Sequence, residues 1–264
     1  MAFPDLTYGT AGVVARIAFN RPARRNALGD TTTRQLLGAC REAIADASVR
    51  VIVITGEGEA FCAGGDFRDT FERGAARSEA EWRERLRGGP NALTRCFSEC
   101  PKPIIASVNG AAVGGGATIA LACDFRIASE RARFGFPFAR LGLAPEFGCS
   151  LLLARTVGFA RATDLLLLGD MVDAREAERI GLVHRTVPHA TLDAATAELA
   201  ARLTAQPPQA LARIKSMVHR AQHLDLDAAL EMEAAELAAA FKSDEHRAAV
   251  SAFLERKRVA RPEG

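Results

Sequence analysis

The sequence predicts an α/β body followed by a helical C-terminal region. Over residues 1–190, short runs rich in Val, Ile or Phe alternate with helical patterns, and this alternation is typical of α/β folds. After Pro188 the composition changes to Ala, Leu, Glu and Arg with almost no β-branched runs, which favours helices. We therefore expect a core at 1–190 and, at 191–264, a helical region that packs on the body or on another subunit.

The predicted strands are apolar runs that end in polar residues or glycine: Val13–Asn20, Val51–Thr55, Ile104–Val108, Asp124–Ala128 and Val183–Val187. Between them, Thr31–Ala45 has apolar residues at helical spacing, and 71–100 is a charge-rich helical stretch that we expect to be broken at Gly88, Gly89 and Pro90. The C-terminal helices are expected over Leu192–Thr204, Pro208–His223, Leu226–Phe241 and Ser243–Arg258.

Composition argues against several classes of protein. A net charge of +2 is too small to imply a nucleic-acid partner. The 6 cysteines show no C-x-x-C pair or zinc spacing, so we expect them to be reduced and mostly buried. No H-E-x-x-H pattern occurs, and we expect no metal. Residues 1–12 lack the basic start and apolar stretch of a secretory signal, so we expect a cytoplasmic protein.

One segment has nearly the length of a membrane span. Pro103–Cys123 runs 21 residues without a charge. Asn109, Gly110 and the triplet Gly114–Gly116 divide it into a strand, a turn and a helix start. A buried strand of a globular core explains this punctuation better than a bilayer-spanning helix, and we expect no membrane partner.

Two glycine-containing stretches follow predicted strands. In Ala60–Asp66, adjacent glycines can hold a backbone conformation barred to other residues and direct an N–H group at a ligand. In Val108–Thr118, a glycine triplet opens a helix, whose first N–H groups are unpaired and favour negative charge. Taken alone, the first stretch is better explained as a simple turn and the second is a weak signal. Neither matches a dinucleotide, phosphate-loop or nucleophile-elbow motif.

Together with a third stretch, Phe134–Glu146, these segments resemble the crotonase (enoyl-CoA hydratase/isomerase) family. The resemblance starts near Asn20-Arg21-Pro22 and Asn26-Ala27-Leu28 and continues through Gly169-Asp170 and Gly181-Leu182-Val183 to the tail Ala252–Lys257. It implies a spiral of ββα units with a helical trimerisation region, assembled as a homotrimer or a dimer of trimers. It also implies an acyl-coenzyme A substrate and no separate cofactor.

The resemblance further implies that the backbone N–H groups of Gly65 and Gly115 form an oxyanion hole for a thioester enolate. The side chains and backbone expected around the substrate are those of Ala27, Ala63, Gly64, Asp66, Thr118, Phe138 and Leu141. Basic residues expected near the coenzyme A phosphates are Arg24, Arg25, Arg68, Arg256 and Lys257, the last two acting with Phe253 on a neighbouring subunit. For each basic residue, a solvated surface charge is an equally good explanation.

The proton-transfer residues depart from the hydratase pattern. Thr118 and Phe138 stand where a typical enoyl-CoA hydratase carries two carboxylates, and they cannot activate water. Glu146 matches the catalytic acid of the peroxisomal type of Δ3,Δ2-enoyl-CoA isomerase. One carboxylate is enough to move a proton from C2 to C4, and apolar neighbours such as Phe138 and Leu143 are expected to raise its pKa.

Several alternatives stay open. Without the resemblance, Glu146 is better explained as an acid that stabilises the first turn of a helix. In the 4-chlorobenzoyl-CoA dehalogenase branch, the same position holds a nucleophilic aspartate. The leading hypothesis is an enoyl-CoA isomerase of fatty or organic acid metabolism with Glu146 as acid/base. Its rivals are an enoyl-CoA hydratase, a hydrolase or lyase on the same fold, and a non-catalytic acyl-CoA binder or oligomeric scaffold.

Overall fold

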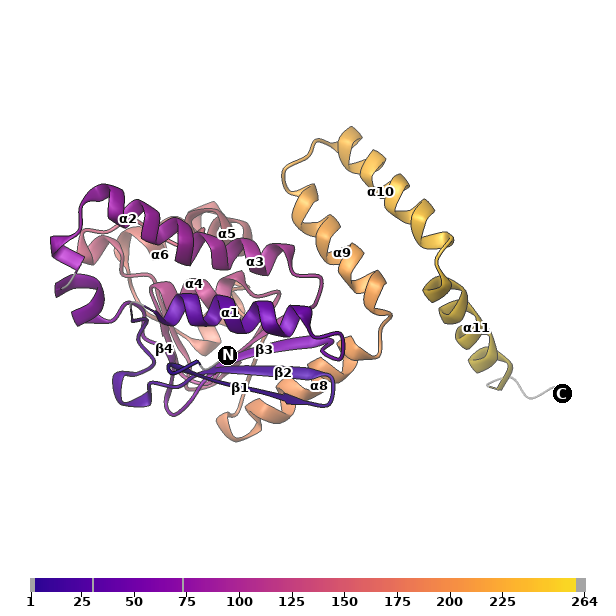
Figure 1. Ribbon diagram of the computed structural model, residues 1–264, viewed down its shortest axis with the longest axis horizontal. Helices are drawn as coiled ribbons and strands as arrows, with labels where there is room; N and C mark the ends of the chain where they lie inside the picture. Colours follow the sequence, from indigo (N-terminus) through magenta and orange to yellow (C-terminus); the bar gives the residue numbers. More distant parts are fainter. Residues whose placement is uncertain (1–2, 30, 73, 260–264) are drawn as a thin grey trace.

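Two β-sheets form the centre of the body (Figure 1). The computed structural model describes residues 3–29, 31–72 and 74–259, with backbone only at 71 and 256–259. The larger sheet has the order β1 (Leu6–Ala11), β2 (Val14–Phe19), β3 (Val51–Gly56), β5 (Ile104–Val108), β7 (Phe125–Ser129) and β10 (Arg185–Val187). The smaller sheet has the order β4 (Ala60–Cys62), β6 (Ala111–Val113), β8 (Arg133–Gly135) and β9 (Val172–Asp173).

Consecutive strands divide between the two sheets. β3, β5 and β7 each lie in the larger sheet and are followed directly by β4, β6 and β8 in the smaller one. Helical segments follow each of these pairs, so the chain repeats a ββα unit, as expected. Neighbouring strands pair in parallel except β1 with β2 and β8 with β9. Because β3, β5 and β7 are parallel neighbours, their ends lie at the same edge of the larger sheet. The strands that follow them, β4, β6 and β8, therefore start at that edge and pair with one another in the smaller sheet.

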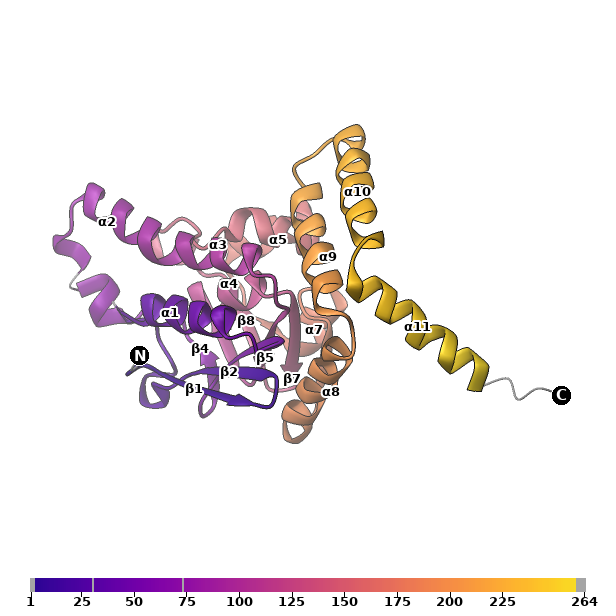
Figure 2. The ribbon, with the colours of Figure 1, turned by 45° about the vertical axis from the view of Figure 1, so that its right-hand side comes forward.

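Helices cover both faces of the larger sheet (Figures 1 and 2). Ile52 and Ile54 of β3 pack in one core cluster with residues of α1 (Thr32–Ala45), α3 (Ala92–Glu99) and α4 (Gly115–Ala122). Val51 and Val53 of the same strand pack in another cluster, with Ala200 of α8 (Leu192–Thr204). Because both faces are covered, β3 and β5 are buried at every residue and are mostly apolar, without alternation of polar and apolar residues.

The stretch at 71–100 differs from its predicted form. It contains α2 (Glu79–Leu86) and α3, joined by a π-helical turn, η4 (Arg87–Asn91), instead of the predicted break. Pro90 has no N–H to donate, and the wider π turn accommodates it without ending the helical path. Before α2 lie a second π-helical segment, η2 (Phe67–Glu72), and the short η3 (Gly74–Ala76).

The predicted strand and helix in 103–123 are confirmed as β5 and α4, with the predicted turn at Asn109 and Gly110 between them. The short strand β6 was not predicted. In the described ranges, no helix is both long and apolar enough to cross a membrane. The remaining helical elements of the body are η1 (Pro22–Arg24), η5 (Ala139–Leu141), α5 (Cys149–Val157), α6 (Phe159–Leu168), α7 (Ala174–Arg179) and η6 (His189–Thr191).

The last three helices extend away from the sheets (Figures 1 and 2). They are α9 (Pro208–Ala221), α10 (Leu226–Phe241) and α11 (Asp244–Val259). Lys215 of α9 fastens this arm, because its Nζ donates to Asp124 Oδ2 at 2.7 Å and to the Lys102 carbonyl at 3.1 Å. α8 packs instead on β3, β5 and β7, on the far face of the larger sheet.

Candidate active site

The loop after β4 presents the amide of Gly65. Leu28 N–H donates to the Gly64 carbonyl at 2.7 Å, and Asp66 N–H donates to the Leu28 carbonyl at 2.9 Å. These two bonds make a parallel bridge between Leu28 and Gly65. In such a bridge, the residue between the two bonded groups directs its own N–H away from the partner strand. Gly65 is exposed, and its N–H therefore points out of the pairing.

The amide of Gly115 is the first of α4. Gly114 precedes the helix with φ of 53°, a conformation that favours glycine. Helix geometry leaves the first N–H groups without a partner in the helix. In the described part of the chain, the amides of Gly65 and Gly115 have no hydrogen-bond acceptor. They are thus not used by sheet or helix pairing.

Glycines let the two loops approach closely. β4 pairs with β6, which places the Ala63–Gly65 loop next to the Gly114–Gly116 loop. A Cβ at Gly64 would lie 2.7 Å from the Val113 carbonyl oxygen, and one at Gly116 would collide with the Cys62 carbonyl. Both glycines are therefore required by the approach of one backbone to another.

The carboxyl group of Glu146 lies beside Gly115. Its Oε1 is 3.0 Å from the point that a Cβ on Gly115 would occupy, and so are Leu28 Cδ1 and Phe147 Cε2. Glu146 is half-buried, and this desolvation raises its pKa to about 7, while the charge of Arg85 acts in the opposite direction. The direction is the one expected from apolar surroundings, although Leu143 is itself exposed.

The backbone that carries Glu146 is strained. Phe147 has φ of 56° and is buried, and left-handed backbone is unusual for a bulky residue. Thr94 of α3 donates its hydroxyl to the Phe147 carbonyl at 3.0 Å. The next residue, Gly148, also has a positive φ of 77°. This turn directs Glu146 towards α4 and is held from outside by α3.

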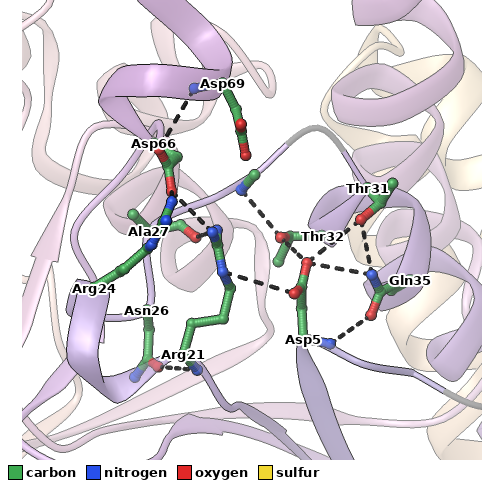
Figure 3. Close-up of polar contacts among 11 residues, drawn as sticks. Asp5, Arg21, Arg24, Asn26, Ala27, Thr31, Thr32, Gln35, Asp66 and Asp69 are labelled. Atoms are coloured by element: carbon green, nitrogen blue, oxygen red, sulfur yellow. Dashed lines mark hydrogen bonds and ion pairs between the residues drawn. The ribbon is translucent and has the colours of Figure 1, made fainter.

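A polar network surrounds the base of the Gly65 loop (Figure 3). Arg21 donates to the Ala27 carbonyl at 2.6 Å and to Asp66 Oδ2 at 2.9 Å, and Arg24 donates to the same Oδ2 at 3.0 Å. Burial acts to raise the pKa of Asp66, but hydrogen bonds from Arg24 and the Asp69 amide, with the charge of Arg21, outweigh it, so this pKa lies below its usual value. Asp66 is therefore an ionised anchor.

The structure brings together part of the expected site. Gly64, Gly65, Gly115 and Glu146 meet at the junction of the two loops, and Ala27 and Ala63 lie in the adjoining backbone. Thr118 is fully buried and donates to the Gly114 carbonyl at 3.1 Å. Phe138 is also buried, whereas Leu141 is exposed on η5.

The expected phosphate-binding residues are more dispersed. Arg68 is exposed on η2, but Arg24 is paired with Asp66. Phe253 is exposed on α11, in the arm that extends from the body. The side chains of Arg256 and Lys257 lie outside the described residues. Contact of all these residues with substrate stays a prediction.

Three residues at the junction were not assigned a role from the sequence: Arg21, Leu28 and Phe147. Arg21 and Leu28 belong to the motifs that carry the family resemblance, which was the available signal. Nothing in the sequence marks Phe147, because its left-handed backbone and its contact with Gly115 arise from tertiary packing. The 6 cysteines are free, and all but Cys96 are buried, as expected.

The comparisons with known proteins agree with this architecture. A family model described as enoyl-CoA hydratase/isomerase matches residues 9–261. The chain belongs to this family. Crystal structures of enoyl-CoA hydratases from Bacillus anthracis and from Polaromonas sp. JS666 superpose on it with TM-scores of 0.89 and 0.90, each at 30% identity. The first covers 96% of both chains, the second 95% of this chain and 97% of its own. The expected crotonase fold is confirmed.

The relatives carry out more than one reaction, according to their names. The 1,2-epoxyphenylacetyl-CoA isomerase of Escherichia coli K12 is 37% identical over 246 residues, 92% of this chain and 93% of the relative. The short-chain-enoyl-CoA hydratase of Clostridium acetobutylicum is 35% identical over 249 residues, 94% of each chain. Membership therefore establishes that the protein is an enzyme of a family that processes acyl-coenzyme A thioesters. It does not identify the reaction, which depends on the residues of the site.

Proposed function

We propose that the protein is an enoyl-CoA isomerase that moves a double bond by a 1,3-proton shift, with Glu146 as the acid/base. The observation that carries the proposal is the Glu146 carboxyl group, half-buried, with a pKa raised to about 7, beside the unpaired amide of Gly115. Threonine and phenylalanine at 118 and 138 supply no further carboxylate. A single proton carrier suits isomerisation better than addition of water.

The two unpaired amides suit a thioester oxygen. In the proposed complex, Gly65 and Gly115 donate to the carbonyl oxygen of a 3-enoyl thioester. The hydrogen bonds strengthen as negative charge develops on that oxygen, so they stabilise the enolate more than the substrate. Loss of one such donor typically lowers kcat by about 10²- to 10³-fold.

The proposed proton path is balanced within the substrate. Glu146 takes a proton from C2, the C2–H electrons enter the C1–C2 bond, and charge moves to the thioester oxygen, giving a dienolate. The same carboxyl group returns the proton to C4, and the double bond ends between C2 and C3. A carboxyl pKa near 7 favours this role, since neither protonation state is strongly preferred at neutral pH.

Hydration of a 2-enoyl thioester is the second candidate, because several named relatives are hydratases. It requires groups that orient water, remove its proton and protonate carbon. Thr118 is poorly suited, since its hydroxyl is buried and bonded to the Gly114 carbonyl. A non-catalytic acyl-CoA binder is the alternative from another class.

Turnover of separate 3-enoyl and 2-enoyl thioesters tests the proposal. We expect conversion of the first without hydration of the second. Glu146→Gln should lower kcat on the 3-enoyl thioester by about 10³-fold, whereas Glu198→Gln, on the surface, should leave it unchanged. Hydration without isomerisation, or full activity of Glu146→Gln, would overturn the proposal. Thioester binding without any turnover would support the binder instead.

A further inference from the structure

We infer that Arg21 is a positioning residue for the Gly65 amide, controlling how strongly the thioester carbonyl is polarised without touching the substrate. The inference rests on the proposed function and goes beyond it, since it concerns a residue behind the oxyanion hole. Arg21 lies in the polar network of Figure 3, where its guanidinium contacts both segments of the Leu28–Gly65 bridge.

The two contacts flank the bridge. Nη1 donates to the carbonyl of Ala27, which directly precedes Leu28, and Nη2 donates to the carboxylate of Asp66, which directly follows Gly65. One rigid, planar group therefore joins the two backbones on either side of the residue whose amide faces the substrate site. A lysine at this position cannot reproduce both contacts, because its ammonium is a point charge on a flexible stem.

Arg21 is itself held in place. Its side chain is 16% exposed, and that of Asp66 only 6%. The backbone N–H of Arg21 donates to Asn26 Oδ1 at 2.9 Å, and the backbone N–H of Asn26 donates to the Arg21 carbonyl at 3.0 Å. Nε lies 3.6 Å from Asp5 Oδ1, and Asp5 accepts hydrogen bonds from Thr32 and Gln35 of α1. The guanidinium thus ties the Gly65 loop to a core helix.

Gly65 needs such external support. It has no side chain that packing could fix, and the three atoms nearest to its Cβ position all belong to Thr70 of η2. The direction of its N–H depends on the peptide plane between Gly64 and Gly65. Preorganised donors lose much of their effect when displaced, and a shift of about 1 Å can reduce a rate by about 10²-fold.

Two variants displace the guanidinium in different ways. Arg21→Lys keeps the positive charge but removes the planar guanidinium that bonds Ala27 and Asp66 at the same time. Gly29→Ala keeps Arg21 but introduces a Cβ that would lie 2.8 Å from its Nη1 and 2.9 Å from Asp69 Oδ2, so that the side chains must shift. Gly9→Ala is the matched glycine control, because nothing lies within 4 Å of the added Cβ. Arg16→Lys is the matched arginine control, on an exposed ion pair with Glu57.

The readouts separate positioning from general stability. A cinnamoyl thioester absorbs at longer wavelength when its carbonyl is polarised, so the shift on binding reports the amides directly. We expect both Arg21→Lys and Gly29→Ala to reduce this shift and to lower kcat by about 10- to 100-fold. KM should change less than about threefold, since ground-state binding is retained. The two controls should match wild type in shift, kcat and thermal midpoint.

The outcomes distinguish the inference from the proposed function. The positioning role would be overturned if Gly29→Ala showed the full absorption shift of the bound cinnamoyl thioester and Arg21→Lys either showed the full shift as well or did not fold. Absence of a shift in wild type would overturn it too, because no polarising amide would exist to position. If wild type shows the shift but does not isomerise a 3-enoyl thioester, the proposed reaction fails. Reduced shifts in the variants would then still support the role of Arg21.

Discussion

Glu146 and Phe147 combine an unfavourable charge with an unfavourable backbone. The carboxylate of Glu146 is desolvated beside Gly115, and Phe147 holds a left-handed φ of 56° although it carries a large side chain. Such backbone conformations cost on the order of 1–3 kcal/mol and persist only where the surroundings fix them. Here the fixing groups are the Thr94 hydroxyl and the packing of the Phe147 ring.

We expect Glu146→Gln to stabilise the protein at pH 8. The pKa of about 7 in the folded protein lies above the 4.5 of an unperturbed glutamate. The contribution of the Glu146 carboxyl group to the free energy of unfolding is therefore fully present below its unfolded pKa. It is lost as the pH rises through 7, by on the order of 3 kcal/mol. Glutamine has no charge to desolvate. Thermal unfolding should show a higher midpoint for the variant at pH 8 and equal midpoints at pH 4.

The catalytic rate should depend on pH in the opposite direction to stability, rising as Glu146 loses its proton. Abstraction of the C2 proton requires the carboxylate form, so kcat/KM for a 3-enoyl thioester should fall about tenfold per pH unit below 7. A pH profile of wild-type kcat/KM, which reports the free enzyme, measures this. A profile that is flat between pH 5 and 8 would contradict Glu146 as the base.

At the level of elements, the sequence predicted most strands of the larger sheet well and the strands of the smaller sheet poorly. β2, β3, β5, β7 and β10 lie within or beside the predicted apolar runs. β4, β6 and β8 have three residues each, too few for any periodicity, and β1 contains Thr7, Tyr8, Gly9 and Thr10, which give no apolar run. These strands are specified by their partners in the sheets.

The site was predictable where function depends on residue type. Glycines and a carboxylate at family spacing indicated positions 64, 65, 115 and 146. Contacts set by tertiary structure could not be derived: the bond from Thr94 to Phe147 joins residues 53 apart, and that from Arg21 to Asp66 joins residues 45 apart. The pairing of Arg24 with Asp66 likewise follows from the fold, whereas its sequence position suggested a phosphate ligand.

The junction of β4 and β6 should not tolerate a side chain at Gly116. A methyl group there would collide with the Cys62 carbonyl and lie 2.8 Å from Cys62 Cβ, and backbone cannot move aside as a side-chain end can. We expect Gly116→Ala to lower the free energy of unfolding by about 1–3 kcal/mol and to lower isomerase kcat at least tenfold. Gly88→Ala, with open space around it, is the control.

The hydroxyl of Thr94 on α3 supports the Glu146 turn. Thr94→Val keeps the shape of the side chain but leaves the Phe147 carbonyl without its donor, which should lower the free energy of unfolding by about 1–2 kcal/mol. Turnover should fall with it, because the turn carries Glu146. Thr163→Val removes a similar bond, to the Phe159 carbonyl on an exposed helix, and should have little effect. Equal effects in both variants would contradict a specific role for Thr94.

At the scale of the whole molecule, the C-terminal arm carries exposed apolar side chains: Ile214, Val218, Leu226, Leu230, Leu237, Phe241, Val250, Phe253 and Leu254. Many exposed apolar side chains on one arm are typical of an interface between subunits. The expected homotrimer or dimer of trimers stays a prediction, and in such an assembly neighbouring subunits would cover these side chains.

Light scattering should give a mass of three or six times the 28.2 kDa chain. We expect Leu237→Glu combined with Phe241→Glu to shift the protein towards the mass of one chain, since two charges would be buried without partners. Val13→Glu places the same charge on an exposed apolar residue in another part of the surface and should leave the mass unchanged. A wild-type mass of 28.2 kDa would contradict the expectation.

An amide N–H is not lost when a side chain is exchanged, so the groups proposed to hold the thioester oxygen persist through most mutations. Residue 118 lies on α4, residue 138 directly before η5, and residue 146 before α5. Because these positions are on different segments, each side chain can change separately. Selection can therefore replace one reaction by another through one or two carboxylates, while recognition of the thioester is inherited. Divergence within such a lineage needs few mutational steps.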